Sequence, residues 1–560
     1  MKKHITKFLI VIAVAGIFIS SCHKIEVTPN SLYTEQVFPK TDAEFQSVMG
    51  TIYTSLRGHY SLAYWFTQEI SSDEAILPVY GGNWFDGQGY IQLHRHDWTK
   101  DHGWITTVWN DAYSIAGLCN QTIYIFRNAP DGDSKNTALA ELRTLRAYAY
   151  WELLDMFGNV PLDTLYPSPG VQAKATRSQV FSFVEGELKA AIPFLKTATG
   201  SSTYGKVTKW MANALLAKLY LNAEVYAGTS KYNECITSCD EIIGSGNFAV
   251  EPRGTYLSQF YPTNGPSFKE FIFAIPYDPS TSNGYLFYGR YDLNRNLGIK
   301  YRYSGSTPGS YAYNQIIMNQ TTGNGLINAK PSGPRATLSS FYNSYFTADA
   351  NDIRNNQWLV GLQNWPDGSP IMVKTTKKGY DQFYTGADGN DSYTYHLYID
   401  SVISARLNPT SIDLGNDEVA WNMGIRNIKF YPDANSSSRN QSNDAPLFRY
   451  SDILLMKAEA ILRGGTATNG HTALSLVNMV RSNRTTSAAW TSVTLDGLYA
   501  ERAREFTWEC WRRNDMIRFG KFENSYGFKT NADTYRRIFP IPTAAMNTNP
   551  KLVQNPGYQQ

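Results

Sequence analysis

The sequence predicts a mainly α-helical protein in which helical parts at residues 36–250 and 441–560 flank a loop-rich insert at residues 251–440. Apolar side chains recur at steps of three and four residues in both flanking parts, which is the spacing of one helix face. The insert is instead rich in Gly, Ser, Asn, Pro and Tyr and has only short apolar runs. We therefore expect one interwoven unit, a helical scaffold from both ends of the chain that carries an irregular middle.

The first 22 residues have the pattern of an export signal. Lys2, Lys3 and Lys7 form a positive start, and an apolar run follows at residues 8–19. That run is too short to cross a hydrocarbon core of ~30 Å as a stop-transfer helix. Residues 1–21 are therefore predicted to be a signal peptide.

The apolar run ends in Ile19-Ser20-Ser21-Cys22, which resembles a lipobox. In a lipobox, small residues admit the processing enzymes and the cysteine thiol accepts a diacylglyceryl group, so Cys22 is the predicted lipidation site. Several acyl chains anchor a protein firmly where one would not, and the polar residues 22–35 suit a tether. The alternative is an ordinary cleaved signal in which Cys22 is incidental.

The mature chain is close to neutral. The whole chain has a formal net charge of +3, and its first 21 residues hold three lysines and no acidic residue, so the remainder has no net charge. Such a chain has no electrostatic bias towards nucleic acid or towards an anionic membrane surface. No later stretch reaches ~18 apolar residues, so no second membrane span is expected.

Five segments before the insert have the apolar spacing of helices. They are residues 110–127, 137–157, 177–195, 208–226 and 232–243. Alanines beside bulky aromatic residues allow close helix contact, and successive antiparallel pairs of this kind resemble tetratricopeptide repeats. After the insert, helices are expected at residues 450–463, 472–484 and 495–519.

The four cysteines after Cys22 match neither a CxxC redox motif nor zinc-ligand spacing. They are Cys119, Cys235, Cys239 and Cys510. We expect buried free thiols. A Cys235–Cys239 disulfide is the alternative, but it would strain the helix expected there.

The helix expected at residues 495–519 carries many charges, and Glu505 and Glu509 lie one turn apart. Two carboxyl groups could suggest a glycosidase, which needs a raised pKa on one of them. The neighbouring arginines would instead favour the ionised form of both, and pairing of Glu509 with Arg512 and Arg513 fits a helix. We therefore predict a structural ion-pair network.

Two clusters suggest metal binding but lack a complete ligand set. His94, His96 and His102 are close in sequence, and the first two would share one face of a strand, yet no carboxylate or cysteine set completes a zinc site. Residues 349–352 lack the spacing, the Gly and the final Glu of an EF-hand, so we expect a loop held by turns and an Asp–Arg pair with Arg354. There is no Walker, GxSxG or HExxH motif. We predict no catalytic residue, no metal and no cofactor.

The segment at residues 78–104 has the composition of a carbohydrate site. Its glycines would hold a loop close to a ligand, and the indole of Trp84 would offer an apolar platform to a sugar ring. Asn83 and Asp86 could bind hydroxyl groups, and Tyr80 lies in the same loop. The alternative for each aromatic side chain is packing under the loop.

Five motifs in order resemble those of the SusD/RagB family. They are LRAY at 145–148 with FGNVPL at 157–162, the alanine-rich segment at 206–228 that ends in LYLNAEVYAG, PLFRYSD with KAEA at 446–460, ERAREF with RRNDMIRFG at 501–520, and FPIP with NPGY at 539–558. The resemblance covers nearly the whole mature chain. It implies a helical fold with tetratricopeptide-like pairs and a protein that caps a SusC-type TonB-dependent barrel as a lid over its nutrient.

The resemblance also implies glycan-binding aromatic residues in the early loop and in the insert. The insert supplies Tyr285, Phe287, Tyr288, Tyr301, Tyr303, Tyr311 and Tyr313. Loops of this family vary widely, so the resemblance predicts which regions bind the ligand and not which individual residues do.

We therefore expect a non-enzymatic, lipid-anchored receptor on the surface of an outer membrane, which captures a glycan and passes it to a SusC-like barrel. The predicted ligand-binding residues are Tyr80, Asn83, Trp84, Asp86, Tyr285, Tyr288 and Tyr303. One alternative is a peptide or other nutrient receptor of the same architecture. Another is a surface glycoside hydrolase in which Asp86 is one of two convergent carboxylates.

Overall fold

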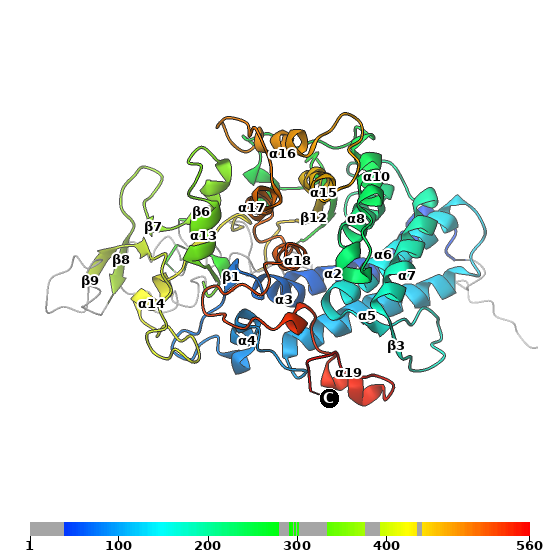
Figure 1. Ribbon diagram of the computed structural model, residues 1–560, viewed down its shortest axis with the longest axis horizontal. Helices are drawn as coiled ribbons and strands as arrows, with labels where there is room; N and C mark the ends of the chain where they lie inside the picture. The colour runs from blue at the N-terminus through cyan, green and yellow to red at the C-terminus, as the bar shows by residue number, and fades with distance from the viewer. Residues whose placement is uncertain are drawn as a thin grey trace, which may run out of the picture.

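The computed structural model describes residues 38–278, 291–294, 296–297, 300–301, 333–375, 393–433 and 440–559. The long helices before the insert are α2 (Asp42–His59), α5 (Gly103–Phe126), α6 (Asp133–Phe157), α7 (Arg177–Ala191), α8 (Lys209–Leu221) and α10 (Tyr232–Ile243). The helices after it are α15 (Tyr450–Leu462), α16 (Ala473–Arg481) and α17 (Leu495–Glu505), followed by the short α18 (Arg512–Arg518) and α19 (Thr543–Thr548). The described chain is therefore mainly α-helical, as predicted (Figure 1).

Shorter elements connect these helices. The helical ones are η1 (Tyr60–Tyr64), α3 (Trp65–Glu69), η2 (Asp86–Gln88), α4 (Gly89–Arg95), η3 (Ile192–Phe194), α9 (Ala223–Ala227), η4 (Leu257–Phe260), α13 (Ser339–Tyr345), η6 (Ile353–Gln357), α14 (Glu418–Asn422) and η8 (Thr534–Arg537). The antiparallel strand pairs are β1 (Ala75–Ile76) with β5 (Ala336–Thr337), β2 (Val160–Pro161) with β3 (Lys174–Ala175), β4 (Phe271–Ile275) with β12 (Ala445–Arg449), β6 (Trp358–Leu359) with β11 (Arg426–Asn427), β7 (Gly361–Leu362) with β10 (Tyr398–Ile399), and β8 (Met372–Thr375) with β9 (Tyr393–His396).

Local sequence explains where several helices begin. Thr41, Thr176 and Thr472 each accept a hydrogen bond from the backbone N–H three residues later, and the side chain of that later residue accepts one from the threonine N–H. This reciprocal capping satisfies amides that have no partner within the helix. It stabilises the starts of α2, α7 and α16.

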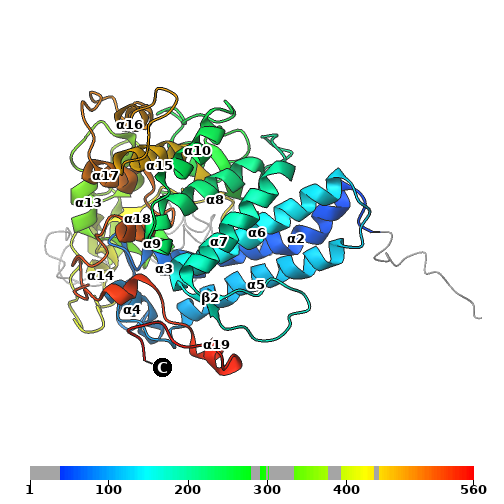
Figure 2. The same ribbon diagram turned by 45° about the vertical axis from the view of Figure 1, so that its right-hand side comes forward.

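The helices from the two ends of the chain form one continuous row. Neighbours in the row are α5, α6, α7, α8, α10, α15 and α16 in that order, and α2 lies against both α5 and α6 (Figure 2). The contact between α10 and α15 joins segments that are separated by the whole insert. Because the two sets share a buried apolar core, neither can bury its apolar face alone.

A two-stranded sheet joins a strand near the start of the insert to the strand that follows the insert. Strand β4 pairs with β12, with Phe271 opposite Arg449 and Ile275 opposite Ala445, and all residues of both strands are buried. The start and the end of the irregular region therefore lie side by side, next to the helices that follow and precede it.

The segment at residues 495–519 is two helices, so the single helix predicted there is wrong. The chain turns between α17 and α18, where Trp508 and Cys510 have positive φ angles of 65° and 66°. The amide of Trp508 donates to Glu74, and the amide of Cys510 donates to Glu69. These buried carboxyl groups satisfy backbone donors that a continuous helix would use internally, which explains the break.

A buried ion-pair network lies where α17 meets the insert, as predicted. Glu505 accepts hydrogen bonds from Arg354 at 3.0 Å, from Arg449 at 2.9 Å and from Arg484 at 2.9 Å. Burial alone would raise the pKa of Glu505, but the surrounding guanidinium groups lower it well below its usual value. All four side chains are almost completely buried.

The predicted partners of Glu509 are wrong. Because the helix ends before Glu509, its carboxylate turns inward and binds Lys429 at 2.5 Å and Arg449 at 2.7 Å. The loop at residues 349–352 carries the predicted Asp–Arg pair, in which Arg354 Nη2 lies 2.6 Å from Asp352. The four cysteines of the described chain are free and buried, as predicted.

The C-terminal segment closes the end of α6. The Asn555 carboxamide donates to the carbonyl of Phe157 at 2.9 Å and to that of Phe539 at 2.8 Å. The Phe539 amide donates to the carbonyl of Met156 at 2.6 Å. The FPIP and NPGY motifs therefore supply donors to carbonyls at a helix end. Among the residues that the structure describes, no helix is both long and apolar enough to span a bilayer.

Candidate functional site

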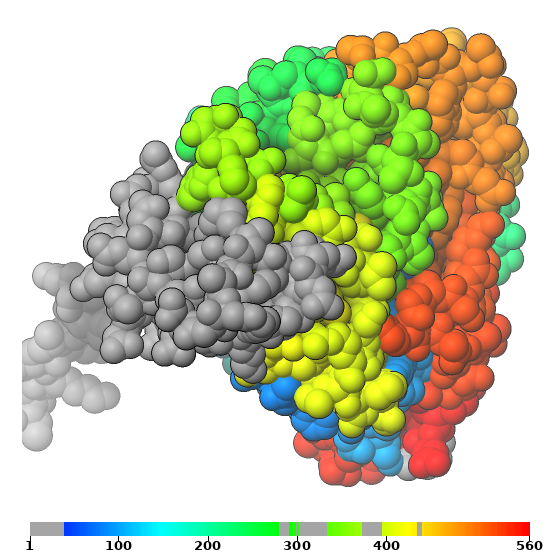
Figure 3. Space-filling model, turned by 90° about the vertical axis from the view of Figure 1, so that its left-hand side faces the viewer, coloured from blue at the N-terminus to red at the C-terminus, as the bar shows by residue number. Residues whose placement is uncertain are grey.

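The loop at residues 79–88, here called the Trp84 loop, is anchored to a segment far along the chain. The Val79 amide donates to the carbonyl of Ile412 at 3.1 Å, and the Leu414 amide donates to that of Val79 at 2.9 Å. The Asp413 carboxylate accepts from the amide of Gly81 at 2.7 Å and from that of Gly82 at 3.1 Å. In Figure 3 the blue segment that contains this loop borders the yellow segment that contains Asp413.

The tip of the Trp84 loop is a tight turn. The Tyr80 amide donates to the Asn83 carbonyl at 2.9 Å, and the Asn83 amide donates back at 3.2 Å. The turn requires positive φ angles of 59° at Gly81 and 84° at Gly82, a region that glycine enters without steric cost. The Asn83 Nδ2 donates to the Tyr80 carbonyl at 2.8 Å, which leaves the amide oxygen of this exposed residue for a ligand.

Tyr80 supports the loop and does not face outwards. Its side chain is completely buried, and its ring stacks on Trp421 of α14 with centroids 4.1 Å apart and an interplanar angle of 8°. Its hydroxyl donates to the carbonyl of Pro334 at 3.3 Å. No face of the Tyr80 ring is open to a ligand, so its contribution to a site is to position the turn.

Trp84 is half-buried at the surface of the loop. Its ring meets that of Tyr291, from the insert, edge to face with centroids 5.3 Å apart and an interplanar angle of 65°. Trp84 also has a positive φ of 65°, which is unusual for a bulky residue and marks a conformation that the surrounding structure must stabilise. The neighbouring Phe85 is 37% exposed, so two aromatic side chains reach the surface here.

Asp86 lies exposed on the same loop, beside a buried aromatic cluster. Burial is the largest cause that raises the pKa of the Tyr90 hydroxyl, and the neighbouring Tyr291 and Asp86 raise this pKa further. The Tyr90 ring packs on Phe66, with centroids 5.0 Å apart, and Phe66 packs on Trp104 at 4.8 Å. Tyr90 and Phe66 belong to the core, so the alternative of packing under the loop holds for Tyr90.

The histidine segment is helical, so the predicted strand is wrong. His94 lies in α4, and His96 follows the end of this helix with a positive φ of 57°. Both are buried, and burial lowers the pKa of His94 to about 3. His102 Nδ1 accepts from the Ile105 amide at the start of α5. Within the described ranges, no group of three His, Cys, Asp or Glu side chains could hold a metal ion.

Several predicted site residues lie outside the described residues. These are Cys22, Tyr285, Phe287, Tyr288, Tyr303, Tyr311 and Tyr313. Tyr301 is described, and it is buried against Tyr431 with ring centroids 5.5 Å apart. Of the residues predicted for the ligand site, the structure therefore brings Asn83, Trp84 and Asp86 together at one exposed loop.

Sequence reasoning missed two residues that shape this loop. Tyr291 lies in the Tyr-rich insert, and the same composition that drew attention to its neighbours could have found it. Asp413 has no such signal, because its role depends on a contact with Gly81 across 332 residues.

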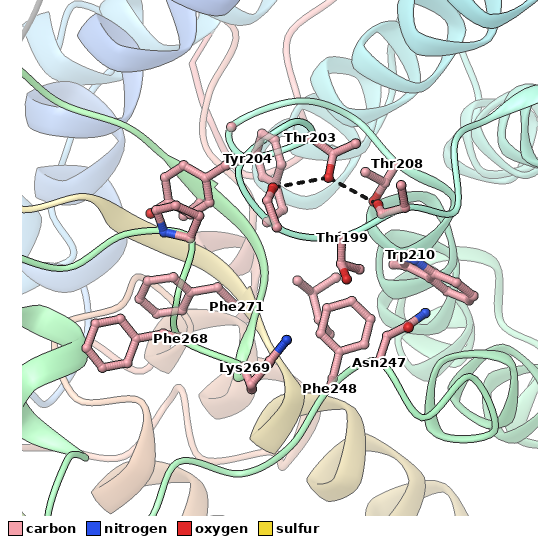
Figure 4. A pocket seen from close by; sticks show the side chains of 17 residues that line it. Thr199, Thr203, Tyr204, Thr208, Trp210, Asn247, Phe248, Phe268, Lys269 and Phe271 are labelled. Carbon is pink, nitrogen blue, oxygen red and sulfur yellow. Dashed lines mark hydrogen bonds between the residues drawn. The ribbon is translucent and has the colours of Figure 1, made fainter.

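A small cavity lies between α8 and β4 (Figure 4). Thr203 is held there by a 3.1 Å hydrogen bond from its hydroxyl to the carbonyl of Ala198. The cavity of about 40 Å³ is lined by Tyr204, Trp210 and Phe248 among others. Pockets for small ligands usually enclose about 300–1,000 Å³, so this cavity is too small for a sugar ring.

The structure combines a helical scaffold with an exposed aromatic loop that is held by a remote segment of the chain. Residues 269–558 match the model of the SusD family, and residues 27–221 match the model described as "Starch-binding associating with outer membrane". The first match alone covers more than half of the chain. This chain belongs to the SusD family, as the resemblance predicted.

Curated relatives and solved structures agree with this assignment. The starch-binding protein SusD of Bacteroides thetaiotaomicron is 26% identical over 519 residues, which cover 88% of this chain and 84% of that protein. SusD-like protein P38 of Formosa agariphila is 23% identical over 98% of each chain. Surface glycan-binding protein A from Bacteroides thetaiotaomicron, solved in complex with laminarihexaose, covers 92% of this chain and is itself fully covered, with a TM-score of 0.61 and 20% identity. This solved structure shares the fold, which confirms the tetratricopeptide-like helical architecture.

Proposed function

We propose that this protein is a non-enzymatic glycan receptor at the cell surface. The observation that carries the proposal is the presentation of Trp84, whose half-buried ring packs edge to face against Tyr291 in a loop that also exposes Asn83 and Asp86. The names of its relatives support it, since one is a starch-binding protein and one solved neighbour was bound to a glucan oligosaccharide.

The chemistry of the Trp84 loop suits a sugar. An indole face packs well on the apolar C–H face of a pyranose ring, and Asn83 and Asp86 lie within three residues of it as hydrogen-bond acceptors for hydroxyl groups. The tight turn and the Asp413 contacts hold these groups before the ligand arrives, which lowers the entropic cost of binding. Tyr285, Tyr288 and Tyr303 remain part of the proposed site.

The proposal includes no bond cleavage. A glycoside hydrolase needs two carboxyl groups about 5–10 Å apart in the cleft. Asp86 is one carboxylate of the Trp84 loop, while the Asp413 carboxylate accepts from three backbone amides, including that of Gly415 at 2.9 Å. Glu505 and Glu509 are buried in ion pairs. Release of reducing ends from a polysaccharide by the pure protein would contradict this part.

The finer proposal is that Cys22 carries the lipid that anchors the protein to the outer membrane, and that a SusC-like TonB-dependent barrel receives the glycan. The lipobox-like residues 19–22 support the anchor, and the family model that names the outer membrane supports the location. A Cys22→Ala protein should be released from membranes in cells that lack the barrel. Its retention there would contradict the lipid anchor.

Native affinity electrophoresis tests the glycan receptor directly. The soluble form that starts after Cys22 is run through gels that contain plant, algal, fungal or host polysaccharides, beside its Trp84→Ala variant. Phe194→Ala, which removes an aromatic ring that is 53% exposed in η3, is the matched control. We expect retardation by one polymer that is lost in Trp84→Ala and kept in Phe194→Ala.

Either other outcome changes the assignment. If the Trp84→Ala variant is still retarded, the aromatic platform that binds the glycan lies in another part of the chain. If no polymer retards the wild type, the glycan proposal fails, and a peptide or other nutrient becomes the ligand to test.

A further inference from the structure

Two hollows meet at Tyr345, and neither is lined by a residue of the Trp84 loop. The first, here called the Tyr499 hollow, has a volume of about 400 Å³ and lies between α13, α17 and the segment after α18. The second, the Trp490 hollow, has a volume of about 380 Å³ and is lined by Trp490 and, from the end of α17, by Arg504. In Figure 3 the light-green segment that contains α13 and the orange-red segment that contains α18 border a recess on this face.

We propose that the two hollows form a second carbohydrate-binding site for a neutral oligosaccharide, which lies across Tyr345. This inference rests on the proposed glycan-receptor function and extends it to a separate surface. Each hollow falls within the ~300–1,000 Å³ range of small-ligand pockets, and together they offer a longer path than one sugar ring needs.

Tyr345 is a rigid divider between the hollows. Its hydroxyl accepts a 2.9 Å hydrogen bond from Arg512, and its ring meets Phe341 edge to face with centroids 5.0 Å apart. Arg512 is itself fixed by two hydrogen bonds to Asp73 of 2.7 Å and 2.8 Å. The half-buried Tyr345 ring is therefore held in place before a ligand arrives, which favours binding.

The charges around the Tyr499 hollow are compensated. Arg512 neutralises Asp73, and Lys521 lies 3.1 Å from Asp496. A charged ligand would have to compete with these pairs, so the hollow favours a neutral one.

The charges around the Trp490 hollow are also paired with one another. Arg481 and Arg504 both bind Oε2 of Glu501, at 3.1 Å and 2.7 Å. The Asp349 carboxylate accepts from the hydroxyls of Thr485 and Ser487, each at 2.8 Å. Neither hollow therefore selects for net charge.

The Tyr499 hollow offers polar groups to a hydroxyl-rich ligand. Its lining includes Ser340, Ser344, Asn524 and Ser525. Within the described part of the chain, the side chains of these four residues have no protein hydrogen-bond partner, and all four are exposed. Hydroxyl and carboxamide groups can both donate to and accept from sugar hydroxyls.

The Trp490 hollow supplies an aromatic platform. The Trp490 backbone exchanges hydrogen bonds of 3.0 Å and 2.9 Å with the Asn478 side chain, and the Arg481 guanidinium lies 4.2 Å from the ring centroid. The indole is thus fixed while it remains half-buried at the surface. An aromatic platform in one hollow and neutral hydrogen-bonding groups in the other, on the two sides of Tyr345, together form a combination that suits a sugar chain.

Calorimetric titration of the soluble full chain with neutral hexasaccharides of the glucan, xylan and mannan series tests the proposal. Ser344→Arg places a long side chain in the Tyr499 hollow from an exposed position of α13. Asn343→Arg changes the adjacent exposed residue, which lines neither hollow, and is the matched control. Trp490→Ala removes the platform of the other hollow.

We expect the wild type and Asn343→Arg to bind two equivalents of one hexasaccharide. Ser344→Arg and Trp490→Ala should each bind one equivalent, which is lost when Trp84→Ala is added. One equivalent in the wild type that depends on Trp84 and not on Ser344 or Trp490 would overturn the second site alone. If the wild type binds no hexasaccharide, the glycan-receptor proposal itself is wrong. Saturable binding of an oligopeptide at the two hollows would show that their ligand is a peptide and not a glycan.

Discussion

The amide of Gly81 donates a 2.7 Å hydrogen bond to Oδ1 of Asp413, a residue 332 positions further along the chain. The same carboxylate binds the amides of Gly82 and Gly415. One side chain therefore holds the Trp84 loop and its own segment in a single arrangement, because hydrogen bonds to an ionised acceptor are among the stronger ones in proteins.

Asp413→Ala should release the Trp84 loop. The change removes an acceptor from three backbone amides, and we expect a loss of about 1–3 kcal/mol in the free energy of unfolding, faster hydrogen exchange at Gly81 and Gly82, and weaker glycan binding. Hydrogen exchange followed by mass spectrometry measures the loop without a ligand.

Asp367→Ala is the control for this change. Asp367 also accepts from a backbone amide, that of Ser369 at 2.9 Å, in an exposed turn away from the loop. Unchanged exchange in Asp413→Ala, or equal changes in both variants, would contradict the anchoring role of Asp413.

Gly81→Ala should destabilise the protein more than Gly82→Ala. Both glycines have positive φ angles, so each alanine costs about 1–2 kcal/mol in backbone strain. A Cβ atom on Gly81 would also lie 2.5 Å from the Cβ of Asn416, whereas one on Gly82 would meet no atom within 4 Å. Chemical denaturation of the two variants measures the difference, and equal losses would show that the close approach of Asn416 is not retained in solution.

Glu505→Gln should cost about 3–5 kcal/mol of stability, because it removes the negative charge that compensates buried guanidinium groups. Those groups belong to Arg354, Arg449 and Arg484. The melting temperature and the denaturant midpoint measure the loss.

Glu523→Gln is the matched control for Glu505→Gln. Glu523 pairs with Arg537 at 2.6 Å, but both side chains are partly exposed, and such pairs contribute about 1 kcal/mol or less. If the two variants lose equal stability, the buried network does not stabilise the protein as strongly as its geometry indicates.

Stability should fall as pH rises towards 8, because of Glu69. Burial raises the pKa of this carboxyl from 4.5 to about 8, and the amide of Cys510 and nearby cations offset part of the effect. Between these two values the folded protein keeps a proton that the unfolded chain releases. The free energy of unfolding therefore decreases with rising pH in that window, by at most about 1.4 kcal/mol per pH unit for this group.

Glu69→Gln keeps an acceptor for the Cys510 amide and removes the titration. Its stability should therefore depend less on pH between about 5 and 8 than that of the wild type. Glu241→Gln, at a half-exposed position of α10, should keep the wild-type slope. Denaturant midpoints measured across this range decide the matter, and a Glu69→Gln slope equal to that of the wild type would contradict the assignment.

Most helices were predictable because their signals are local. Tyr232–Ile243 matches its predicted range, and α6 ends at Phe157, which is the predicted end of that helix. The segment from Leu495 was not predictable, since its apolar spacing continues through the break. The acceptors that stabilise the break, Glu69 and Glu74, lie more than 430 residues earlier.

The candidate site was predictable in part for the same reason. Trp84, Asn83 and Asp86 lie in one short stretch, so composition alone could mark them. Tyr80 stands in that stretch as well, but its burial against Trp421 depends on a contact that no local pattern contains.

The sequence by itself determined most helix-forming segments and the position of an aromatic loop, because each depends on residues that are neighbours along the chain, and for the same reason it allows the export signal to be predicted. Only the tertiary structure decided which side chains of that loop face outwards, where the long charged segment breaks, and that α10 and α15 join the two helical parts. Those outcomes depend on burial and on hydrogen bonds between remote residues, and such contacts exist only once the chain has folded.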